Sequence, residues 1–425
     1  MKVIAEGLPE ATDYFGIVRT LIDIPDCIVV EHGAPGTMTY TQLSYNTINR
    51  ERIHGRIFSS GVDETDIVMG SDSRLIRTIL WIDEKYHPSA IAVVASAITA
   101  VIGLDVVGIC HKVQSQVSAR LIPFPSGGFS GTYFSGIESG SRALVDTFLV
   151  DRKVSRSDSP TVNILGPTGD VFNRASDYEE IRRILGLLGV QVNTVFPRGC
   201  STSGIASIPS ADLNLVTRDL MLPVATYIRD ICGQEYLYGL PMGIRGTIQW
   251  IRDLSAHLDI PYPEMMVARE VASWAYALPE LFGRVHPYEQ FSAVIAAPFE
   301  YAYGLSRIVT EDWGLQVSSV LLPEKPRSSS YSDAFATFGI SRVEVDLSDN
   351  RYRDILRTEK PTLLFGNTYH LKMGKQVPIR IHAASPTPDL ITLFDGTPYA
   401  GFRGYAYLTQ RLVNEAIAHP EVFRT

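Results

Sequence analysis

The chain has 425 residues, of which 45% are apolar and 20% charged, and its formal net charge at pH 7 is −8. This composition excludes an intrinsically disordered chain, and at roughly 100–200 residues per domain it predicts two to four domains. No run rich in Lys and Arg occurs in the sequence, so we expect no nucleic-acid partner. Residues 1–15 lack an apolar run of signal-peptide length, which favours a cytoplasmic protein with no membrane partner.

Short apolar runs alternate along the chain with segments of helical periodicity, such as Asp177–Leu188 and Ile244–Leu258. Such alternation predicts parallel sheets covered by helices on both faces. The uncharged segment Pro88–Leu104 is interpreted as a buried strand that runs into a helix rather than as a membrane span. The predicted strands are Cys27–Glu31, Asp66–Met69, Ala90–Ala95, Arg120–Pro123, Thr161–Leu165, Gln191–Val195, Ser292–Ala297, Gln316–Leu321, Thr362–Phe365 and Ile379–Ile381.

Two polar segments rich in turn-forming residues divide this pattern. The first is Asp151–Pro160, and the second falls near Pro287, just before a predicted strand. We therefore predict an α/β fold of three doubly wound, Rossmann-like αβα domains at residues 1–155, 156–288 and 289–425.

Common catalytic motifs are absent from the sequence. It has no GxxxxGK[ST], HExxH or GxSxG pattern, so a P-loop for ATP is excluded. The loop Gly127–Gly136 lacks the glycine spacing and the acidic residue of a dinucleotide site. The loop Gly166–Asp170 follows a predicted strand and precedes a helix, so its backbone N–H groups could meet an anion, or it is a plain strand-to-helix turn.

The four cysteines are Cys27, Cys110, Cys200 and Cys232, and no two form a CxxC pair. The spacing excludes a zinc knuckle and a ferredoxin-type cluster site, and so few cysteines suit a reducing compartment. Cys27 and Cys110 fall inside predicted elements and are expected in the core. Cys200 follows the predicted strand Gln191–Val195 at its carboxyl end, where ligands of open α/β sheets gather, and is the one functional candidate among them.

Several segments in order together resemble the nitrogenase component 1-type oxidoreductase family, which includes nitrogenase α and β chains, cofactor-assembly scaffold proteins and the dark-operative protochlorophyllide reductases. The similarity runs from about Gly7 to Asn414. The segments are VVEHGAPGTMTY (29–40), DIVMGSDSRL (66–75), IAVVASAITAVIGLDV (91–106), PSGGFSG (125–131), VNILGPTGD with SDYEEIRRILGLLGVQVN, ADLNLV (211–216), LPMGIRGT (240–247), GNTYHLKMGKQVPIRIH (366–382) and PYAGFRG (398–404). The resemblance implies three αβα domains, pairing as a heterodimer and often a heterotetramer, and an iron–sulfur cluster in the complex.

The sequence departs from the family at the cluster ligands. In the family, three cysteines of the first domain hold iron, and the matching positions here are Ala11, Thr37 and Ala97. Alanine and threonine offer no thiolate, so we expect the cluster to be held mainly by a partner chain. Near the family's cofactor cysteine, after LNLV, this chain has Thr217 and Arg218.

Six positions are expected to face the family's cluster or cavity, with no metal ligand among them and no catalytic residue assigned. His382 falls near the family's cofactor histidine, and a hydrogen-bonded loop residue is the alternative for it. These positions are Thr37, Ala97, Cys200, His382, Ser126 and Ser130. Further polar groups on comparable loops are Tyr133, Asn367, Tyr369 and Arg403.

Three functions fit this interpretation of the sequence. In the first, the chain is the β-like subunit of a nitrogenase-like reductase, supplying cavity wall and docking surface, with a Cys-bearing α-like subunit and a separate ATP-dependent iron-protein-like reductase as partners. In the second, it is a scaffold or maturation protein that holds a metallocluster or tetrapyrrole precursor without turnover. In the third, it is a binding module that takes no part in redox chemistry. The retained HG turn, IGLD helix start and GFSG loop favour the first.

Overall fold

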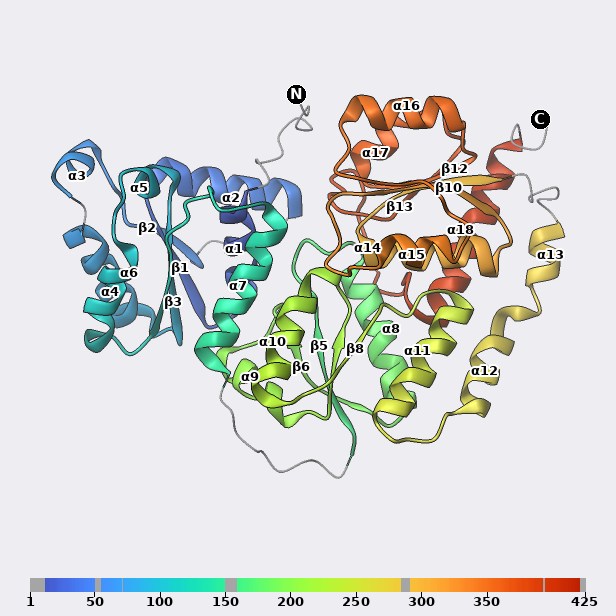
Figure 1. Ribbon diagram of the computed structural model, residues 1–425, viewed down its shortest axis with the longest axis horizontal. Helices are drawn as coiled ribbons and strands as arrows, with labels where there is room; N and C mark the ends of the chain where they lie inside the picture. Colours follow the sequence, from blue (N-terminus) through green and yellow to red (C-terminus); the bar gives the residue numbers. More distant parts are fainter. Residues whose placement is uncertain are drawn as a thin grey trace.

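The computed structural model describes residues 12–49, 55–70, 72–149, 159–283, 291–392 and 394–420. The strands form three separate sheets, each part of one αβα unit, and the units follow one another in the sequence (Figure 1). The strand orders are β2-β1-β3-β4, β6-β5-β7-β8 and β11-β10-β9-β12-β13. Every strand pair is parallel, which confirms the predicted doubly wound α/β fold. The predicted boundaries at 155 and 288 stay predictions, because both positions lie outside the described residues.

The first unit encloses its two central strands completely. Every residue of β1 and β3 is buried, because helices α1 and α7 cover one face of the sheet and α4 and α6 cover the other. Its elements are α1 (Asp13–Ile22), β1 (Cys27–His32), α2 (Pro35–Asn49), β2 (Ile57–Ser59), α3 (Glu64–Met69), α4 (Asp72–Tyr86), β3 (Ala90–Ala95), α5 (Ala97–Val101), α6 (Val106–Val113), β4 (Arg120–Phe124) and α7 (Tyr133–Phe148).

The second unit is built around β5 and β7, whose side chains are almost entirely buried. Its amide network, in which Asn163 donates to Asn214 at 2.8 Å, ties these two strands together. Its elements are β5 (Thr161–Leu165), α8 (Arg174–Leu187), β6 (Gln191–Phe196), α9 (Thr202–Ala206), β7 (Leu213–Val216), α10 (Leu222–Cys232), β8 (Tyr236–Tyr238), α11 (Gly243–His257), α12 (Glu264–Ala275) and α13 (Leu278–Gly283).

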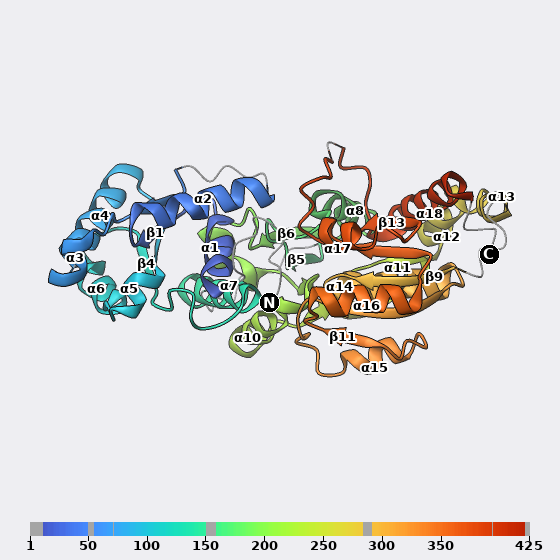
Figure 2. The ribbon, with the colours of Figure 1, turned by 90° about the horizontal axis from the view of Figure 1, so that it is seen from above.

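The third unit contains the five-stranded sheet and the long final helix (Figures 1 and 2). Helix α14 continues into a π-helical turn at Ile308–Asp312. Its elements are β9 (Ser292–Ala296), α14 (Phe299–Arg307), β10 (Gln316–Leu322), α15 (Tyr331–Ala336), β11 (Val343–Val345), α16 (Asp349–Glu359), β12 (Leu363–Gly366), α17 (Thr368–Met373), β13 (Ile379–His382) and α18 (Gly401–Ala418).

Asp177, in α8, joins the second and third units. Its carboxylate accepts hydrogen bonds from the backbone N–H groups of Tyr399 (2.5 Å) and Ala400 (2.9 Å), and from the hydroxyl of Tyr301. A buried carboxylate needs such donors, because an unpaired one would be strongly destabilising. The contact fixes the start of α18 against α8.

One predicted strand is wrong. The segment Asp66–Met69 lies in the helix α3, which begins with a capping box: the Asp66 N–H donates to the Asp63 side chain at 3.0 Å, and the Asp63 N–H donates back to the Asp66 side chain at 3.0 Å. The apolar residues that suggested a strand are instead exposed on α3. Sequence reasoning also missed the short strands β2, β7, β8 and β11.

Pro88–Leu104 forms β3 and then α5, as interpreted from the sequence. Among the residues that the structure describes, no helix combines the length and the apolar character needed to cross a bilayer.

Helices α1 and α7 approach closely enough that only glycine fits at their contact. A Cβ added to Gly16 would lie 1.8 Å from the Tyr133 carbonyl oxygen, and one added to Gly136 would lie 2.1 Å from the Asp13 carbonyl oxygen. Because the obstructing atoms are backbone atoms of a facing helix, the two helices would have to separate to admit a methyl group.

Gly16→Ala is therefore expected to lower the free energy of unfolding by about 1–3 kcal/mol, through overpacking. Gly186→Ala is the matched control, because Gly186 lies in α8 with no atom within 4 Å of its added Cβ. There the helix propensity of alanine should raise the free energy of unfolding by up to about 1 kcal/mol. Urea denaturation of both variants measures the difference, and equal effects of the two substitutions would contradict the helix contact.

Candidate functional site

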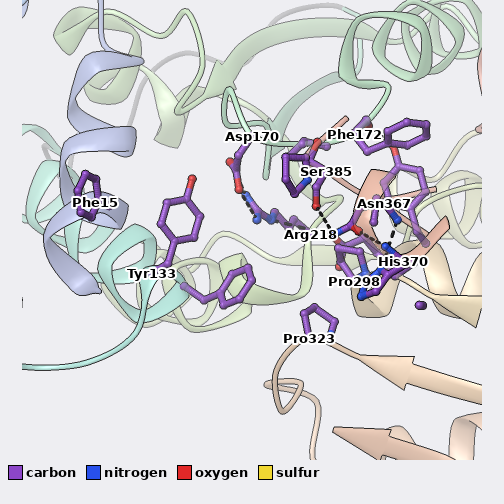
Figure 3. Close-up of a pocket in the computed structure, with 18 of the residues that line it drawn as sticks. Phe15, Tyr133, Asp170, Phe172, Arg218, Pro298, Pro323, Asn367, His370 and Ser385 are labelled. Carbon is purple, nitrogen blue, oxygen red and sulfur yellow. Dashed lines mark hydrogen bonds and ion pairs between the residues drawn. The ribbon is translucent and has the colours of Figure 1, made fainter. Parts of the chain in front are cut away.

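A cavity of about 240 Å³ lies where the three units meet (Figure 3). The first unit contributes residues of α1, α2 and α7, the second contributes two loops at the carboxyl ends of β5 and β7, and the third contributes the loops after β9, β10, β12 and β13. The carboxyl ends of parallel strands are the usual ligand sites of open α/β sheets. The lining residues are Phe15, Ser44, Tyr45, Tyr133, Phe134, Asp170, Val171, Phe172, Arg218, Ala296, Ala297, Pro298, Glu300, Tyr301, Pro323, Asn367, His370, Ala384, Ser385 and Pro386.

A buried ion pair forms the polar part of the wall. The Arg218 guanidinium donates to both carboxylate oxygens of Asp170, at 2.9 and 3.2 Å, and also to the Thr168 hydroxyl. Burial lowers the pKa of Arg218, but Asp170 and Glu300 together with the other nearby groups outweigh burial and raise it. Burial raises the pKa of Asp170, but Arg218, the Thr168 hydroxyl and Arg19 together outweigh burial and lower it. Both side chains of the pair are therefore charged, and each is hydrogen-bonded to the other.

Glu300, at the start of α14, faces the same pair from the third unit with weaker contacts. Its carboxyl oxygens lie 3.9 Å from Arg218 Nε and 3.5 Å from the Asp219 backbone nitrogen. Burial raises the pKa of Glu300 to about 7, which Arg218 only partly offsets. Burial likewise lowers the pKa of His370 to about 4, so this imidazole is neutral at pH 7. The cavity thus has one carboxyl group that exchanges a proton near neutral pH.

A second polar site lies under the carboxyl edge of the first sheet. Glu31 is fully buried at the end of β1, and its Oε2 accepts a hydrogen bond from the Tyr14 hydroxyl at 2.7 Å. Its Oε1 has no hydrogen-bond partner among the described residues and lies beside Gly33 and Ser96. Burial raises the pKa of Glu31 to about 7.

Comparison with known proteins agrees with this architecture. The sequence profile of the nitrogenase component 1 type oxidoreductases matches residues 12–417. The chain belongs to that family.

Among curated relatives, the B subunit of the light-independent protochlorophyllide reductase of Heliobacterium modesticaldum is 26% identical over 426 residues, covering 97% of this chain and 79% of that protein. The corresponding protein of Prosthecochloris aestuarii is 26% identical over 436 residues, covering 96% of this chain and 79% of that protein. The solved structure of nitrogenase Cp1 at pH 6.5 superposes with a TM-score of 0.76 at 17% identity and covers 98% of this chain and 94% of that one. This last similarity is one of fold.

The positions of the first unit that were predicted to face the family's cluster gather at the carboxyl edge of the first sheet. Thr37 is in the first turn of α2, after β1, and Ala97 begins α5, after β3. The loops are neighbours, because the Ser96 N–H and the Thr99 hydroxyl both donate to the His32 carbonyl, at 3.0 and 2.7 Å. Ala11 lies outside the described residues.

Ser126 and Ser130 belong to the loop after β4, at this same edge. A Cβ on the neighbouring Gly127 would lie 2.8 Å from the Ser96 carbonyl oxygen, which places this loop against the start of α5. The four predicted positions of the first unit are therefore brought to one edge of one sheet.

The side chains at this edge do not fit an iron–sulfur cluster. Thr37 offers a hydroxyl and Ala97 a methyl group, whereas iron in such clusters is held by thiolates. In the described part of the chain, no three His, Cys, Asp or Glu side chains gather as a metal site requires.

Cys200 and His382 lie apart from that edge and do not line the cavity. The Cys200 thiol is buried beside the Thr194 hydroxyl at 3.3 Å, and burial raises its pKa to about 11. His382, at the end of β13, lies 3.3 Å from Asp389, and burial lowers its pKa. Cys27 and Cys110 are buried in the core, as expected from the sequence.

Of the other polar candidates, Tyr133 and Asn367 line the cavity, whereas Tyr369 and Arg403 do not. Sequence reasoning gave no role to the charged residues of the cavity, Arg218, Asp170 and Glu300. Each follows a strand within a few positions, which is the signal that would have found them. The loop Gly166–Asp170 does meet an anion, because the Gly169 N–H donates to the Asp23 carboxylate of the first unit at 2.9 Å.

Glu31→Gln tests the buried carboxyl group under the edge. The folded chain keeps the Glu31 proton up to about pH 7, and the unfolded chain releases it near pH 4.5. The free energy of unfolding therefore falls as the pH rises between these values, by about 3 kcal/mol for a shift of this size. The amide of the variant cannot ionise. Its free energy of unfolding, relative to that of wild type, should therefore rise by about 3 kcal/mol between about pH 5 and 8.

Denaturation of both proteins at the two pH values measures this change. Glu179, in α8, supplies the control substitution Glu179→Gln. Parallel pH profiles of wild type and Glu31→Gln would show that Glu31 ionises as an ordinary carboxyl group.

Proposed function

We propose that this chain is the β-like subunit of a nitrogenase-like reductase complex. In this proposal a homologous, Cys-bearing α-like subunit supplies the cluster ligands, and a separate ATP-dependent iron-protein-like reductase delivers electrons. This chain provides docking surface and cavity wall. Family membership and the relatives named as B subunits of a reductase support the coarse assignment.

The observation that carries the proposal is the character of the carboxyl edge of the first sheet. The family loops are present there in their order, but exposed apolar side chains surround them. Val68 and Met69 on α3 are 82% and 80% exposed, Val101 on α5 is 73% exposed, and Phe129 in the loop after β4 is 67% exposed. Helices α3 and α5 lie at the same end of the molecule (Figures 1 and 2).

Exposed apolar groups gathered in one place mark protein interfaces, because their burial on association is favourable. The surface defined by Val68, Met69, Val101 and Phe129 is therefore the proposed docking surface. A protein wall can tune a cluster by excluding water without giving it a ligand. The substitution of family cysteines by Thr37 and Ala97 fits a chain that covers a cluster held by its partner.

The proposal predicts a colourless chain that becomes part of a brown, iron-containing assembly. The chain is purified alone and after co-expression with homologues encoded beside it, and iron content, absorption spectrum and mass are measured. Val101→Glu should abolish the assembly, because it would bury a charge without a partner. Met265→Glu is the matched control, since Met265 is 78% exposed on α12 of the second unit.

Iron bound stoichiometrically to the lone chain would contradict the ligand assignment. A colourless monomer in the presence of every co-expressed homologue would favour a binding module, and an assembly that forms equally well with Val101→Glu would place the interface elsewhere.

A further inference from the structure

The cavity between the three units suits one small molecule with an apolar body. Its volume of about 240 Å³ is below the roughly 300–1,000 Å³ of pockets for drug-sized ligands, and corresponds to about eight waters at roughly 30 Å³ each. Aromatic rings of Phe15, Tyr45 and Phe134 line it from the first unit, and Phe172 from the second. A flat unsaturated ring would pack against these walls.

The charges of the wall disfavour an anionic ligand. Arg218 is the only cationic side chain among the described lining residues that is charged at pH 7. Its guanidinium already donates to Asp170 through hydrogen bonds of 2.9 and 3.2 Å (Figure 3). It also donates to the Thr168 hydroxyl. A carboxylate or phosphate would have to break this buried pair or lie unpaired beside Asp170, and either is costly.

Glu300 is a carboxyl group of the cavity wall that contacts its neighbours only at long distance. Its contacts with the neighbouring residues are long, at 3.5 Å to the Asp219 backbone nitrogen and 3.9 Å to Arg218, and its own backbone N–H also donates to it. The other titratable groups that face it are Asp219, whose carboxylate also raises the pKa of Glu300, and the tyrosines Tyr238 and Tyr301. The Tyr238 hydroxyl donates to Asp219 at 3.3 Å, and the Tyr301 hydroxyl donates to Asp177. Burial raises the pKa of Glu300 to about 7, so below that pH its carboxyl group is a hydrogen-bond donor.

We propose that this cavity binds one small, uncharged, unsaturated molecule with a carbonyl- or imine-type acceptor, which forms a hydrogen bond with the carboxyl group of Glu300. The inference goes beyond the role in a complex and concerns the chain alone. The proposal is one of binding alone, in which no proton is transferred from Glu300 to the ligand.

The test is fluorine NMR titration of the full chain, without partners, with para-fluoroacetophenone. This ketone has a single acceptor and no N–H donor. Its apparent Kd should rise by about 30-fold between about pH 6 and 8.5, since only the protonated fraction of Glu300 is competent to donate. The anion para-fluorobenzoate, of similar size, should bind at least about tenfold more weakly than the ketone at pH 6.

Two kinds of variant separate the contributions. In Glu300→Gln the amide N–H₂ still donates, so ketone binding should persist and lose its pH dependence. Ala297→Leu adds bulk to the apolar wall and should abolish binding, and Ala384→Val should weaken it with a smaller change in volume. Thermal unfolding by circular dichroism shows whether each variant folds. Exposed Glu264 on α12 gives the control Glu264→Gln, which should bind as wild type does.

Equal affinity at both pH values, benzoate binding as tight as ketone binding, or a pH dependence that survives in Glu300→Gln would each overturn the proposal. No partner chain takes part in these measurements. A negative result would therefore leave complex formation untouched, and a failure to assemble would leave ligand binding untouched.

Discussion

The buried pair of Arg218 and Asp170 constrains the centre of the molecule. A guanidinium at a junction of three units is tolerated only with its charge matched and its N–H groups bonded, because an unpaired buried charge costs several kcal/mol. Asp170 and Thr168 meet this need from the loop after β5, and Glu300 approaches at 3.9 Å from the third unit. The arrangement disfavours an anionic ligand in the cavity, and it contacts Glu300 only at long distance.

The loop that carries Asp170 is also fixed from its other side. Asp23, at the end of α1, accepts hydrogen bonds from the Gly169 N–H at 2.9 Å, from Arg19 at 2.8 Å and from Arg198 at 2.5 Å. Gly169 lies directly against the Arg19 guanidinium, where a Cβ would lie 2.6 Å from its central carbon. Charge pairs thus connect the first and second units and Asp177 connects the second and third, in addition to the apolar clusters that both junctions share. The loop that carries Asp170 is therefore held both by the first unit, through Asp23, and by Arg218 of the second.

The sequence allowed the fold to be predicted closely, and the centre of the cavity hardly at all. Buried strands such as Ala90–Ala95 and Thr161–Leu165 read as continuous apolar runs, and the structure has them at those bounds. Asp66–Met69 looked equally apolar, but Asp63 supplies a helix cap, and local capping decided the structure. Arg218 and Asp170 lie in loops that are 48 residues apart in the sequence. The sequence pattern does not indicate which buried cationic side chain pairs with which carboxylate. The burial that shifts the pKa of Glu300 likewise arises only after three units have packed together.

Helices α1 and α2 connect the carboxyl edge of the first sheet to the cavity. Helix α2 carries Thr37 in its first turn and Tyr45 in the cavity wall, and the Tyr45 hydroxyl donates to the Phe15 carbonyl of α1 at 2.5 Å. The Thr37 carbonyl accepts a hydrogen bond from the Thr41 hydroxyl. The Thr41 hydroxyl in turn lies 3.1 Å from the Tyr14 hydroxyl, and the Tyr14 hydroxyl donates to Glu31.

These contacts use the backbone of Thr37 and leave the side chain out. A cysteine could therefore be exchanged for threonine at the edge without disturbing the bonds that shape the cavity. The absence of a thiolate that the sequence predicts at Thr37 is therefore compatible with the family's fold.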